Sequence, residues 1–472
     1  MRFTKIICTL GPSSSDTPVM EALLHAGMNV ARINMSHGSP EKHRAAIQAI
    51  HAWNERRVRT KQTACAIMID TKGGEIRTGD TDNPIPVAKD EEVIFSSALT
   101  SSSANKKTIT VNYSGFGNDV RETDRILLDN GEIMFDIVRI HPNGDVVARA
   151  RQDGKIGSRR HINLPGANVD LPSITDQDWK DIAFGMERNV DFVALSFIRN
   201  RDDIEAVRSF IAEKKGHTEI VAKIETKQSV ENIVEIIHAA DAIMIARGDL
   251  GAELPFEQIP VIQDEIVRRS REIGKPVIIA THMLESMIIN ATPTRAEVTD
   301  IAHAAVTGTD ATMLSGETAA GRHPVIALEA MDRVLRATEE HLLRFGTRTS
   351  DAVLTDRQAR AEAACTLSES TGAKALIVFT RTGQSARDLS KFRPRIPILS
   401  FTDMPDVQRK LALSYGVMSY CLKFSADPES TVTEALAQAR GSGLLQTGDR
   451  VVVVSDAKAH EQLINTVQLR VA

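Results

Sequence analysis

The sequence predicts a (β/α)8 barrel with an inserted all-β domain and a C-terminal α/β domain. The first observation is a set of eight short apolar runs, which begin near Lys5, Asn29, Cys65, Val190, Ile220, Ala242, Pro276 and Ala311. The second is that segments of helical periodicity separate most of these runs. The third is a single gap in this rhythm, between Asp70 and about Leu171, which lacks helical periodicity.

We predict that residues 1–70 and 167–345 form the barrel. Its helices are expected at about 16–27, 40–58, 175–188, 201–214, 228–239, 256–274, 294–307 and 323–345. A strand followed by a helix, eight times over, is what a (β/α)8 (TIM) barrel requires. The strands of such a barrel are buried on both faces, which explains why the apolar runs are continuous rather than alternating.

Residues 71–166 are predicted to form the inserted β-domain. Their Val-, Ile- and Thr-rich runs are interrupted by the turn sequences Asn130-Gly131, Asn143-Gly144 and Asp153-Gly154. Such pairs indicate β-hairpins. Loops that follow barrel strands surround the active site, so a domain inserted after the third strand is placed to act as a lid that excludes water.

Residues 346–472 are predicted to form the C-terminal α/β domain. The polar stretch 346–357 is expected to be a linker. Strands are expected at 374–379, 397–402, 416–422 and 450–455, with helical segments between them. This alternation indicates a mostly parallel sheet.

Composition favours a cytoplasmic globular protein. The chain of 472 residues is 42% hydrophobic and 25% charged with a net charge of −5, so no basic excess indicates nucleic acid. No apolar run reaches the roughly 18 residues that a membrane span needs, and the N-terminal apolar run is too short for a signal peptide. The cysteines are far apart and indicate core thiols in a reducing compartment: Cys8, Cys65, Cys365 and Cys421.

The central chemical feature is a pair of adjacent apolar runs that end in charge. Lys223 and Glu225 end the run from Ile220, and Asp249 follows the run from Ala242. Residues two apart on a strand face the same way, and a neighbouring strand would bring Asp249 beside them. One ammonium and two carboxylates suit a divalent metal with a phosphate. A plain Lys–Glu pair with a helix-capping Asp is the alternative reading.

Polar and charged residues also follow the other predicted barrel strands. They occur in Arg32 to Gly38, Asp70 to Lys72, Arg247 to Asp249, Ala280 to Met283 and Ser315 to Thr318. In a barrel these strand ends meet at one face, where the active site lies. So many polar strand ends favour a catalytic face over random surface polarity.

The chain resembles the pyruvate kinase family over essentially its full length. The resemblance rests on Thr4 to Pro12, Ala31 to Gly38, Asp70 to Thr78, Lys223 to Glu225, Ala246 to Gly251, Ala280 to Met287, Pro293 to Glu297 and Met313 to Thr318. It implies the three-domain fold predicted above. It also implies transfer of the phosphoryl group of phosphoenolpyruvate to ADP, giving pyruvate and ATP, in glycolysis.

The resemblance and the charges together imply roles for six residues. Glu225 and Asp249 would hold Mg²⁺ (or Mn²⁺), and Lys223 and Arg32 would stabilise charge on the phosphoryl group. Free N–H groups at the helix start from Ala246 to Asp249 suit the substrate carboxylate, and Gly248 permits its close approach. Thr281 matches the family's threonine for protonating the enolate, through water. Without the resemblance, Gly248 is equally well explained as a turn residue and Thr281 as a capping residue.

The resemblance also implies a monovalent cation site and a nucleotide site. The residues that match the family's K⁺ ligands are Asn34, Ser36, Asp70 and Thr71. Glu75 matches the form of the family that depends on K⁺, whereas relatives that do not need K⁺ carry a lysine at this position. The residues matching the nucleotide contacts are Asn34, Met35, Ser36, His37, Arg77 and Arg160. Both arginines are equally readable as solvated surface charges.

A second phosphate-like site is expected in the C-terminal domain. A hydroxyl- and Gly-rich turn precedes a predicted helix there, with the candidate residues Thr380, Arg381, Thr382, Gly383 and Ser385. Such a turn makes an anion nest, although an ordinary capped turn explains it too. The family binds effector phosphates here. The segment after Ser455 is short and lacks the loop that helps fructose-1,6-bisphosphate to bind, which favours a sugar monophosphate or AMP.

Three positions depart from the family's common residues, and the resemblance further implies a homotetramer. Asn200 replaces a lysine, His282 a glutamine and Gly74 a proline. Asn200 puts one nucleotide contact in doubt. Three alternative functions remain.

An adhesion module would present Arg247-Gly248-Asp249, but the sequence has no signal peptide. An inactive sensor of sugar phosphates is disfavoured by the intact charged residues. Another barrel enzyme acting on phosphoenolpyruvate or an oxo acid, such as an aldolase or a carboxylase, is disfavoured by the inserted domain.

Overall fold

The computed structural model describes residues 1–97, 106–167, 169, 171–345, 354–459 and 462–472. Within these residues, eight parallel strands close a barrel in the order β1-β17-β16-β15-β14-β13-β3-β2. The predicted barrel is therefore confirmed. Its strands are β1 (Lys5–Leu10), β2 (Val30–Asn34), β3 (Ala66–Asp70), β13 (Phe192–Leu195), β14 (Glu219–Ile224), β15 (Ala242–Ala246), β16 (Val277–Ala280) and β17 (Ala311–Leu314).

Helices surround the barrel where the sequence predicts them. Several start with a capping box, in which an N-cap side chain and the third helical residue satisfy each other's free N–H groups, as at Thr175, Asn200 and Thr294. The helices are α1 (Thr17–Ala26), α2 (Pro40–Arg59), α4 (Asp176–Met186), α5 (Arg201–Glu213), α6 (Lys227–Glu231), α7 (Ile233–Ala239), α9 (Ile259–Ile273), α10 (Arg295–Thr307) and α12 (Pro324–Phe345). The helix expected at 228–239 is split in two at Asn232.

The barrel strands pack one face outward and one face inward. Ile243 and Ile245 of β15 pack outward against the helices, whereas Met244 between them packs in the barrel interior. On β14, Val221 faces the interior and Ala222 faces the helices. The same two-residue period places Lys223 on the inner face, at the carboxyl end of β14.

The inserted domain is all-β apart from two short helices, as predicted, and its strand pairs are antiparallel except for the parallel pair β6 and β7. Within the described residues, seven strands form a sheet in the order β4-β12-β8-β9-β10-β6-β7, and β11 pairs with β5. The strands are β4 (Ile76–Arg77), β5 (Ile85–Val87), β6 (Glu92–Ser96), β7 (Thr108–Thr110), β8 (Arg125–Leu128), β9 (Ile133–Ile140), β10 (Val146–Ala150), β11 (Gly154–Ile156) and β12 (His161–Asn163), with the short helices α3 (Phe116–Asp119) and η1 (Asp129–Gly131).

Two of the three predicted hairpins in this domain are confirmed. Asn130-Gly131 lies between the antiparallel strands β8 and β9, and Asn143-Gly144 lies between β9 and β10. The predicted hairpin at Asp153-Gly154 is absent, so this prediction is wrong: β11 pairs with β5 rather than with β10. Gly154 is needed there for another reason: a Cβ at this position would lie 2.4 Å from Cδ1 of Ile133.

The C-terminal domain is an α/β sheet, in the described part of the chain, with the strand order β20-β19-β18-β21-β22. Its elements are α13 (Asp356–Thr371), β18 (Ala375–Phe379), α14 (Gln384–Lys391), β19 (Ile398–Thr402), α15 (Pro405–Lys410), β20 (Val417–Cys421), α16 (Pro428–Gly441), β21 (Arg450–Ala459) and β22 (Gln462–Val471). The sequence analysis did not predict β22, which is antiparallel to β21. Most of the expected linker, 346–353, lies outside the described residues, and α13 begins at Asp356.

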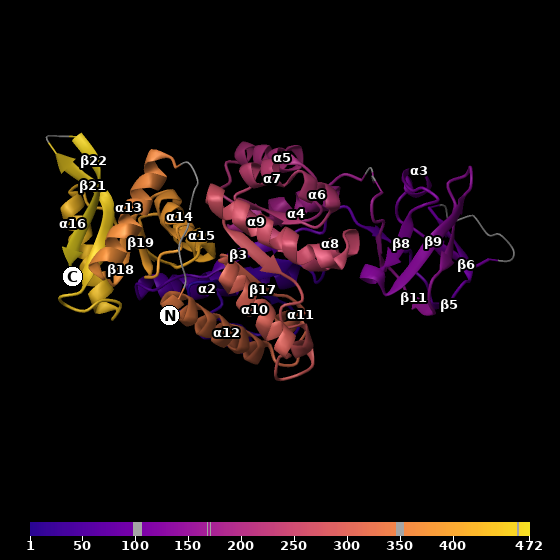
Figure 1. The fold of residues 1–472 in the computed structure, drawn as a ribbon, viewed down its shortest axis with the longest axis horizontal. Helices are drawn as coiled ribbons and strands as arrows, with labels where there is room; N and C mark the ends of the chain where they lie inside the picture. Colours follow the sequence, from indigo (N-terminus) through magenta and orange to yellow (C-terminus); the bar gives the residue numbers. More distant parts are fainter. Residues whose placement is uncertain (98–105, 168, 170, 346–353, 460–461) are drawn as a thin grey trace.

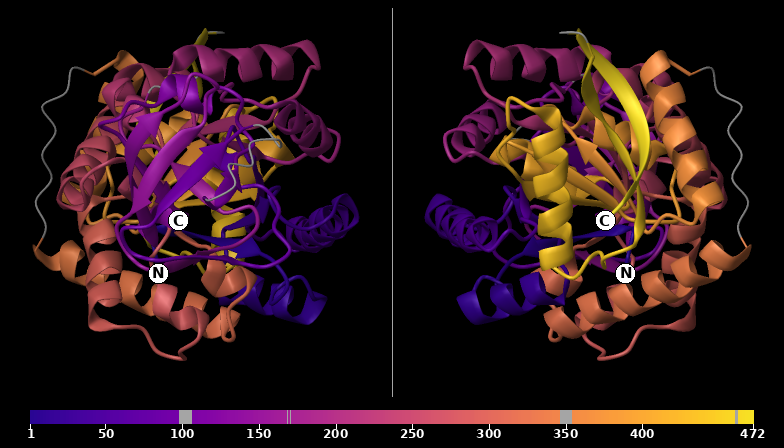
Figure 2. Two further views of the ribbon diagram at one scale, coloured as in Figure 1. Left: turned by 90° about the vertical axis from the view of Figure 1, so that its right-hand side faces the viewer. Right: turned by 90° about the vertical axis from the view of Figure 1, so that its left-hand side faces the viewer.

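The two outer domains lie at opposite ends of the barrel. Figure 1 shows the C-terminal domain at one end and the inserted domain at the other, beyond the short helix α8 (Arg247–Glu253). Figure 2 shows the inserted domain in front of the barrel in one end-on view and the C-terminal sheet in front of it in the other. No helix among the described residues is long and apolar enough to cross a membrane.

Candidate active site

Lys223 occupies the centre of the barrel mouth nearest the inserted domain. Its Nζ lies 2.8 Å from Oε1 of Glu225 and 3.1 Å from Oδ1 of Asp70, and it donates a hydrogen bond of 2.7 Å to Oγ of Ser196. The side chain is buried. Burial favours the neutral amine, but Asp70 and Glu225 outweigh it and raise the pKa of Lys223, so its charge is held firmly.

Asp70 joins Lys223 to a second cation, Arg32. Nε of Arg32 donates to Oδ2 of Asp70 at 2.7 Å, and its Nη1 donates to Oγ1 of Thr9 at 2.9 Å. Burial opposes the ionised form of Asp70, yet Arg32 and Lys223 together lower the pKa of its carboxyl. One buried carboxylate therefore fixes both cations at the mouth of the barrel.

Glu225, which is buried, and the partly buried Asp249 form an acidic pair beside Lys223. Glu225 accepts a hydrogen bond of 2.7 Å from the backbone N–H of Phe197, and the carboxyls of Glu225 and Asp249 share a hydrogen bond. Burial raises the pKa of both groups and outweighs the opposing effect of Lys223; Asp249 adds to the rise at Glu225, and Glu75 and Asp70 add to it at Asp249. One of the two carboxyls therefore retains a proton unless another cation replaces it.

The residues around this pair fit a hard divalent cation. Three carboxylates (Asp70, Glu225 and Asp249) face two permanent cations (Arg32 and Lys223), so the fully ionised cluster carries one excess negative charge. Mg²⁺ is commonly held by one or two carboxylates, with water and substrate oxygens completing its shell. No group of three or more His, Cys, Asp or Glu residues suited to a metal occurs among the described residues, so this pair would rely on such outside ligands.

Thr281 and Gly248 meet beside the acidic pair. The Thr281 hydroxyl donates to the carbonyl of Ala280 at 2.6 Å and accepts a hydrogen bond of 2.8 Å from the N–H of Gly248. The sequence analysis expected this N–H to be free, and the structure corrects that expectation. A Cβ at Gly248 would make only ordinary contacts, at 3.5 Å, with Thr281 and His282, so the protein's own packing does not demand glycine here.

Comparison with known proteins identifies the family. Residues 1–328 match the family described as pyruvate kinase, barrel domain, and residues 358–469 match pyruvate kinase, alpha/beta domain. The chain belongs to the pyruvate kinase family. It is thus a phosphotransferase related to enzymes of glycolysis.

Similar pyruvate kinases occur in plants, bacteria and protists. Plastidial pyruvate kinase 3 of Arabidopsis thaliana is 41% identical over 99% of this chain and 82% of its own length. A pyruvate kinase of Staphylococcus epidermidis is 37% identical over 98% of this chain and 79% of its own. The crystal structure of a pyruvate kinase from Cryptosporidium parvum superposes with a TM-score of 0.90 at 35% identity, covering 99% of this chain and 96% of that one.

The four candidate K⁺ ligands lie at the ends of the neighbouring strands β2 and β3. Asn34 is paired in register with Asp70. The N–H of Ser36 donates to Oδ1 of Asn34 at 3.1 Å, and Oγ1 of Thr71 accepts from the N–H of Ser196 at 3.2 Å. The structure thus brings together the oxygen donors that the sequence analysis grouped.

The candidate nucleotide residues are divided between the barrel and the inserted domain. Asn34, Met35, Ser36 and His37 follow β2 on the barrel, whereas Arg77 pairs with Glu75 at 2.6 Å and Arg160 with Asp129 at 2.8 Å in the inserted domain. A cavity of about 330 Å³ lies between the two domains, lined by Glu75, His161, Phe197, Arg199 and Glu253 among others. Asn200 does not reach it as a ligand would, because its side chain caps α5 through the N–H of Asp203.

The candidate effector residues lie far from this cavity, in the C-terminal domain (Figure 1). Thr380 accepts a hydrogen bond of 2.9 Å from the N–H of Gly383, Thr382 accepts one from Gln384, and Arg381 pairs with Asp403 at 3.0 Å. Ser385 lies in the first turn of α14. The turn is therefore a strand-to-helix connection with hydrogen bonds of its own, and its arginine is already in an ion pair.

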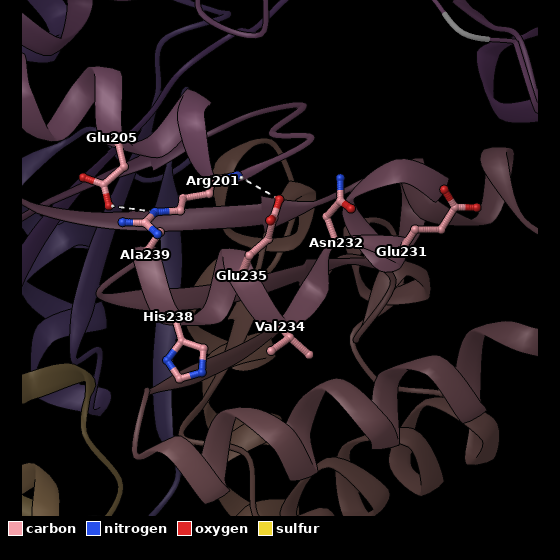
Figure 3. A pocket seen from close by; sticks show the side chains of 8 residues that line it. All are labelled: Arg201, Glu205, Glu231, Asn232, Val234, Glu235, His238 and Ala239. Atoms are coloured by element: carbon pink, nitrogen blue, oxygen red, sulfur yellow. Dashed lines mark hydrogen bonds and ion pairs between the residues drawn. The ribbon is translucent and has the colours of Figure 1, made fainter.

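A wider surface hollow of about 540 Å³ lies away from the strand ends, along α5 and α7 (Figure 3). Its charged side chains are partly paired with each other, since Arg201 contacts Glu205 at 3.5 Å and its backbone N–H donates to Glu235. It holds no residue of the cluster around Lys223. We therefore place the active site at the barrel mouth and not in this hollow.

The sequence analysis missed three residues that hold the cluster in place. Ser196 receives the hydrogen bond from Lys223 and donates to the carbonyl of Thr71 at 2.7 Å. The N–H of Phe197 binds Glu225, and Thr9 binds Arg32. The available signal was position: Thr9 lies near the end of β1, and Ser196 and Phe197 directly follow β13.

Proposed function

We propose that this protein transfers the phosphoryl group of phosphoenolpyruvate to ADP, giving pyruvate and ATP, with the help of Mg²⁺ or Mn²⁺ and of K⁺. The observation that carries the proposal is the buried Lys223, fixed between Asp70 and Glu225 beside Arg32 and Asp249. Phosphoryl transfer depends mainly on positioning and on neutralising charge, and this cluster offers both.

Lys223 and Arg32 are proposed to neutralise the transferring phosphoryl group from two sides. Both are held rigidly, because Asp70 binds each of them through a different carboxylate oxygen. Glu225 and Asp249 would hold Mg²⁺, which when bound supplies positive charge to the substrate's carboxylate and enol oxygens. The family match and the acidic pair support this assignment.

Thr281 is proposed to direct a proton to the enolate that remains after transfer. Its hydroxyl proton is engaged with Ala280 and one lone pair with Gly248, which leaves one lone pair to accept a hydrogen bond from a water. That water, and not the threonine itself, would deliver the proton. A hydroxyl of ordinary acidity is a poor acid, so orienting a water is the role it suits.

K⁺ would be held by Asn34, Ser36, Asp70 and Thr71, and the ADP phosphates by Arg77 and Arg160 together with residues 34–37. One supporting observation is that Asn34 is paired in register with Asp70 and accepts a hydrogen bond from the N–H of Ser36, which places the oxygen donors at neighbouring strand ends. Another is that Arg77 and Arg160 are the sequence neighbours of Ile76 and His161, which line the cavity between the two domains. Arg77 and Arg160 are each paired with one carboxylate, so nucleotide phosphates would have to exchange with Glu75 and Asp129.

The remaining proposals concern regulation, assembly and location. We propose that residues 380–385 bind a sugar monophosphate or AMP, that the chain forms a homotetramer, and that it works in the cytoplasm. We also propose that residues 1–70 together with 167–345 form the barrel domain, residues 71–166 the inserted domain, and residues 346–472 the C-terminal domain. The Arabidopsis relative is chloroplastic by name, so cell fractionation has to decide the location, and light scattering the assembly.

A coupled assay of pyruvate and ATP formation from phosphoenolpyruvate and ADP tests the proposal. It is run with Mg²⁺, with and without K⁺, and with a panel of sugar phosphates and AMP. We expect ATP formation that needs both cations and that rises with one of the effectors. Purified protein that makes no ATP from phosphoenolpyruvate with both cations present would disprove the function.

A further inference from the structure

A small cavity lies at the seam between the barrel and the C-terminal domain. Arg271, at the end of α9, and Lys275 contribute to it from the barrel side, and Arg387 and Lys391 of α14 from the C-terminal domain. Arg393 completes the cationic lining, and Asp310 is the one carboxylate among the described lining residues. The cavity measures about 10 Å³, which is room for a single water-sized particle.

The lining carries a large excess of positive charge. Five cations line the cavity, and Asp310 is the one carboxylate among the described lining residues. Carboxylates outside the lining also act on these cations: Glu219, which pairs with Arg387 at 2.6 Å, Asp241, Glu272, Asp388 and Glu362. Asp310 is itself taken by Arg393 at 2.6 Å. Buried charges without compensation are costly, so proteins pair them or bind an opposite charge.

Arg271 is the clearest uncompensated charge. Its Nη1 donates to the carbonyl of Thr307 at 2.9 Å, but it forms no ion pair with any described residue. Burial and the neighbouring Arg393 lower the pKa of its guanidinium to about 10. A fall in the pKa of an arginine means that the local field disfavours positive charge.

Hydrogen-bond donors are also left over at the same place. Nε of Arg271, Nε of Arg387 and the hydroxyl of Ser414 are buried and have no partner, and all three residues line the cavity. Buried polar groups are nearly always satisfied, and unsatisfied ones commonly mark an ion or a water that belongs there. The two Nε–H groups can only donate, so they require a hydrogen-bond acceptor in the cavity.

We propose that this cavity binds one monatomic anion, chloride being the obvious physiological one. A water would accept hydrogen bonds from the donors but would leave the positive charge uncompensated. An anion would accept the same hydrogen bonds and also compensate the charge. The volume excludes phosphate and other polyatomic anions unless the seam opens. The bound anion would fasten α14 to the barrel beside Glu219, the first residue of β14.

Thermal unfolding at constant potassium concentration tests the proposal directly. The unliganded enzyme is unfolded in potassium gluconate and in mixtures in which chloride replaces gluconate up to 150 mM. We expect the midpoint to rise by about 2 °C at the highest chloride concentration and to follow the logarithm of the chloride concentration once the site is filled, as binding to one site of the folded state requires. A midpoint that is the same in both salts, or that rises in proportion to the chloride concentration itself, would overturn the proposal.

A pair of variants on one helix separates the anion from general salt effects. Arg271→Met removes the uncompensated charge, so we expect it to abolish the chloride-dependent rise. Arg269→Met is the control, because Arg269 lies on the same helix, is partly exposed and pairs with Glu265 instead; it should keep the full rise. Equal chloride dependence in both variants would contradict the proposed site.

Crystals grown in bromide give a readout that needs no variant. We expect an anomalous difference peak between Arg271, Arg387 and Ser414. Density without an anomalous signal would show that a water fills the cavity, and the proposal would be wrong. Neither result bears on the phosphotransfer reaction, which is measured separately.

Discussion

Lys223 is held by two carboxylates at 2.8 and 3.1 Å, so its charge is a fixed part of the site. Lys223→Met keeps the length and the burial of the side chain but removes that charge. We expect kcat to fall by about 10³-fold, which is in the range for losing one preorganised electrostatic contact. Steady-state kinetics measures the loss, and circular dichroism checks that the fold survives. A kcat near that of the parent enzyme would refute the role.

Lys106→Met is the control for this substitution. Lys106 lies on the surface of the inserted domain, is not among the residues that line the cavity, and pairs with Glu92 at 2.6 Å. Loss of such a surface pair costs little. We therefore expect kcat to stay within about twofold of the parent value.

The acidic pair makes metal binding dependent on pH. Burial, with a contribution from Asp249, raises the pKa of Glu225 to about 7, and a carboxyl must lose its proton before it can hold a cation. We expect the apparent Kd for Mn²⁺ to rise about tenfold per pH unit below 7 and to level off above it. Electron paramagnetic resonance of free Mn²⁺ measures this. Affinity that is independent of pH between 5.5 and 7 would contradict the raised pKa.

At the residue scale, the charged residues of the site can be predicted from the sequence, but the uncharged residues that hydrogen-bond to them cannot. Lys223 and Glu225 were placed together because a strand has a period of two, and the structure brings them to 2.8 Å. Ser196 and the N–H of Phe197 were missed because a lone serine and a backbone group carry no charge pattern. Their role depends on which strand lies next to β14, and β13 does.

At the element scale, the loop after β3 carries the proposed K⁺ dependence. Glu75 lies there beside Arg77 and adds to the negative field around Asp249. We expect activity to fall at least tenfold when K⁺ is replaced by an inert organic cation. Glu75→Lys should remove this dependence, because a fixed ammonium substitutes for the bound cation. If the parent enzyme is equally active with and without K⁺, the hypothesis is wrong.

Glu75→Gln provides the control for that substitution. It removes the same negative charge without adding a positive one, so we expect activity to remain dependent on K⁺. A K⁺-independent Glu75→Gln enzyme would show that loss of the carboxylate, and not the new ammonium, is responsible.

The elements themselves were predicted best where their pattern is local. The barrel strands and their helices follow from short apolar runs and helical periodicity, and capping residues such as Thr175 and Thr294 mark the starts. The failures are non-local. Gly154 looked like a turn glycine, but it is required by contact with Ile133, and β22 depends on pairing with β21. Neither partner is visible from a single segment.

At the scale of the whole molecule, the C-terminal domain is anchored to the beginnings of barrel strands whose ends carry the chemistry. Arg387 pairs with Glu219 at the start of β14, Arg393 with Asp310 just before β17, and Arg409 with Asp191 just before β13. Lys223 and Glu225 lie at the other end of β14. A change at the proposed effector turn, which leads directly into α14, would therefore have a short physical route to the proposed active site.

The Arg409–Asp191 pair predicts how this seam depends on pH. Asp191 is almost fully buried and lies 2.8 Å from Arg409, yet burial raises the pKa of its carboxyl to about 6. Arg409→Met would leave this charge unpaired, which typically costs about 3–5 kcal/mol. At pH 5 the folded variant avoids most of that cost, because Asp191 takes up a proton; at pH 8 it cannot. We therefore expect the unfolding midpoint of Arg409→Met, relative to the parent, to fall much further at pH 8 than at pH 5 in a thermal melt. Arg159→Met, which breaks an exposed pair with Asp80, should change the midpoint little at either pH, and an equal drop for Arg409→Met at both would show that Asp191 does not titrate as its burial implies.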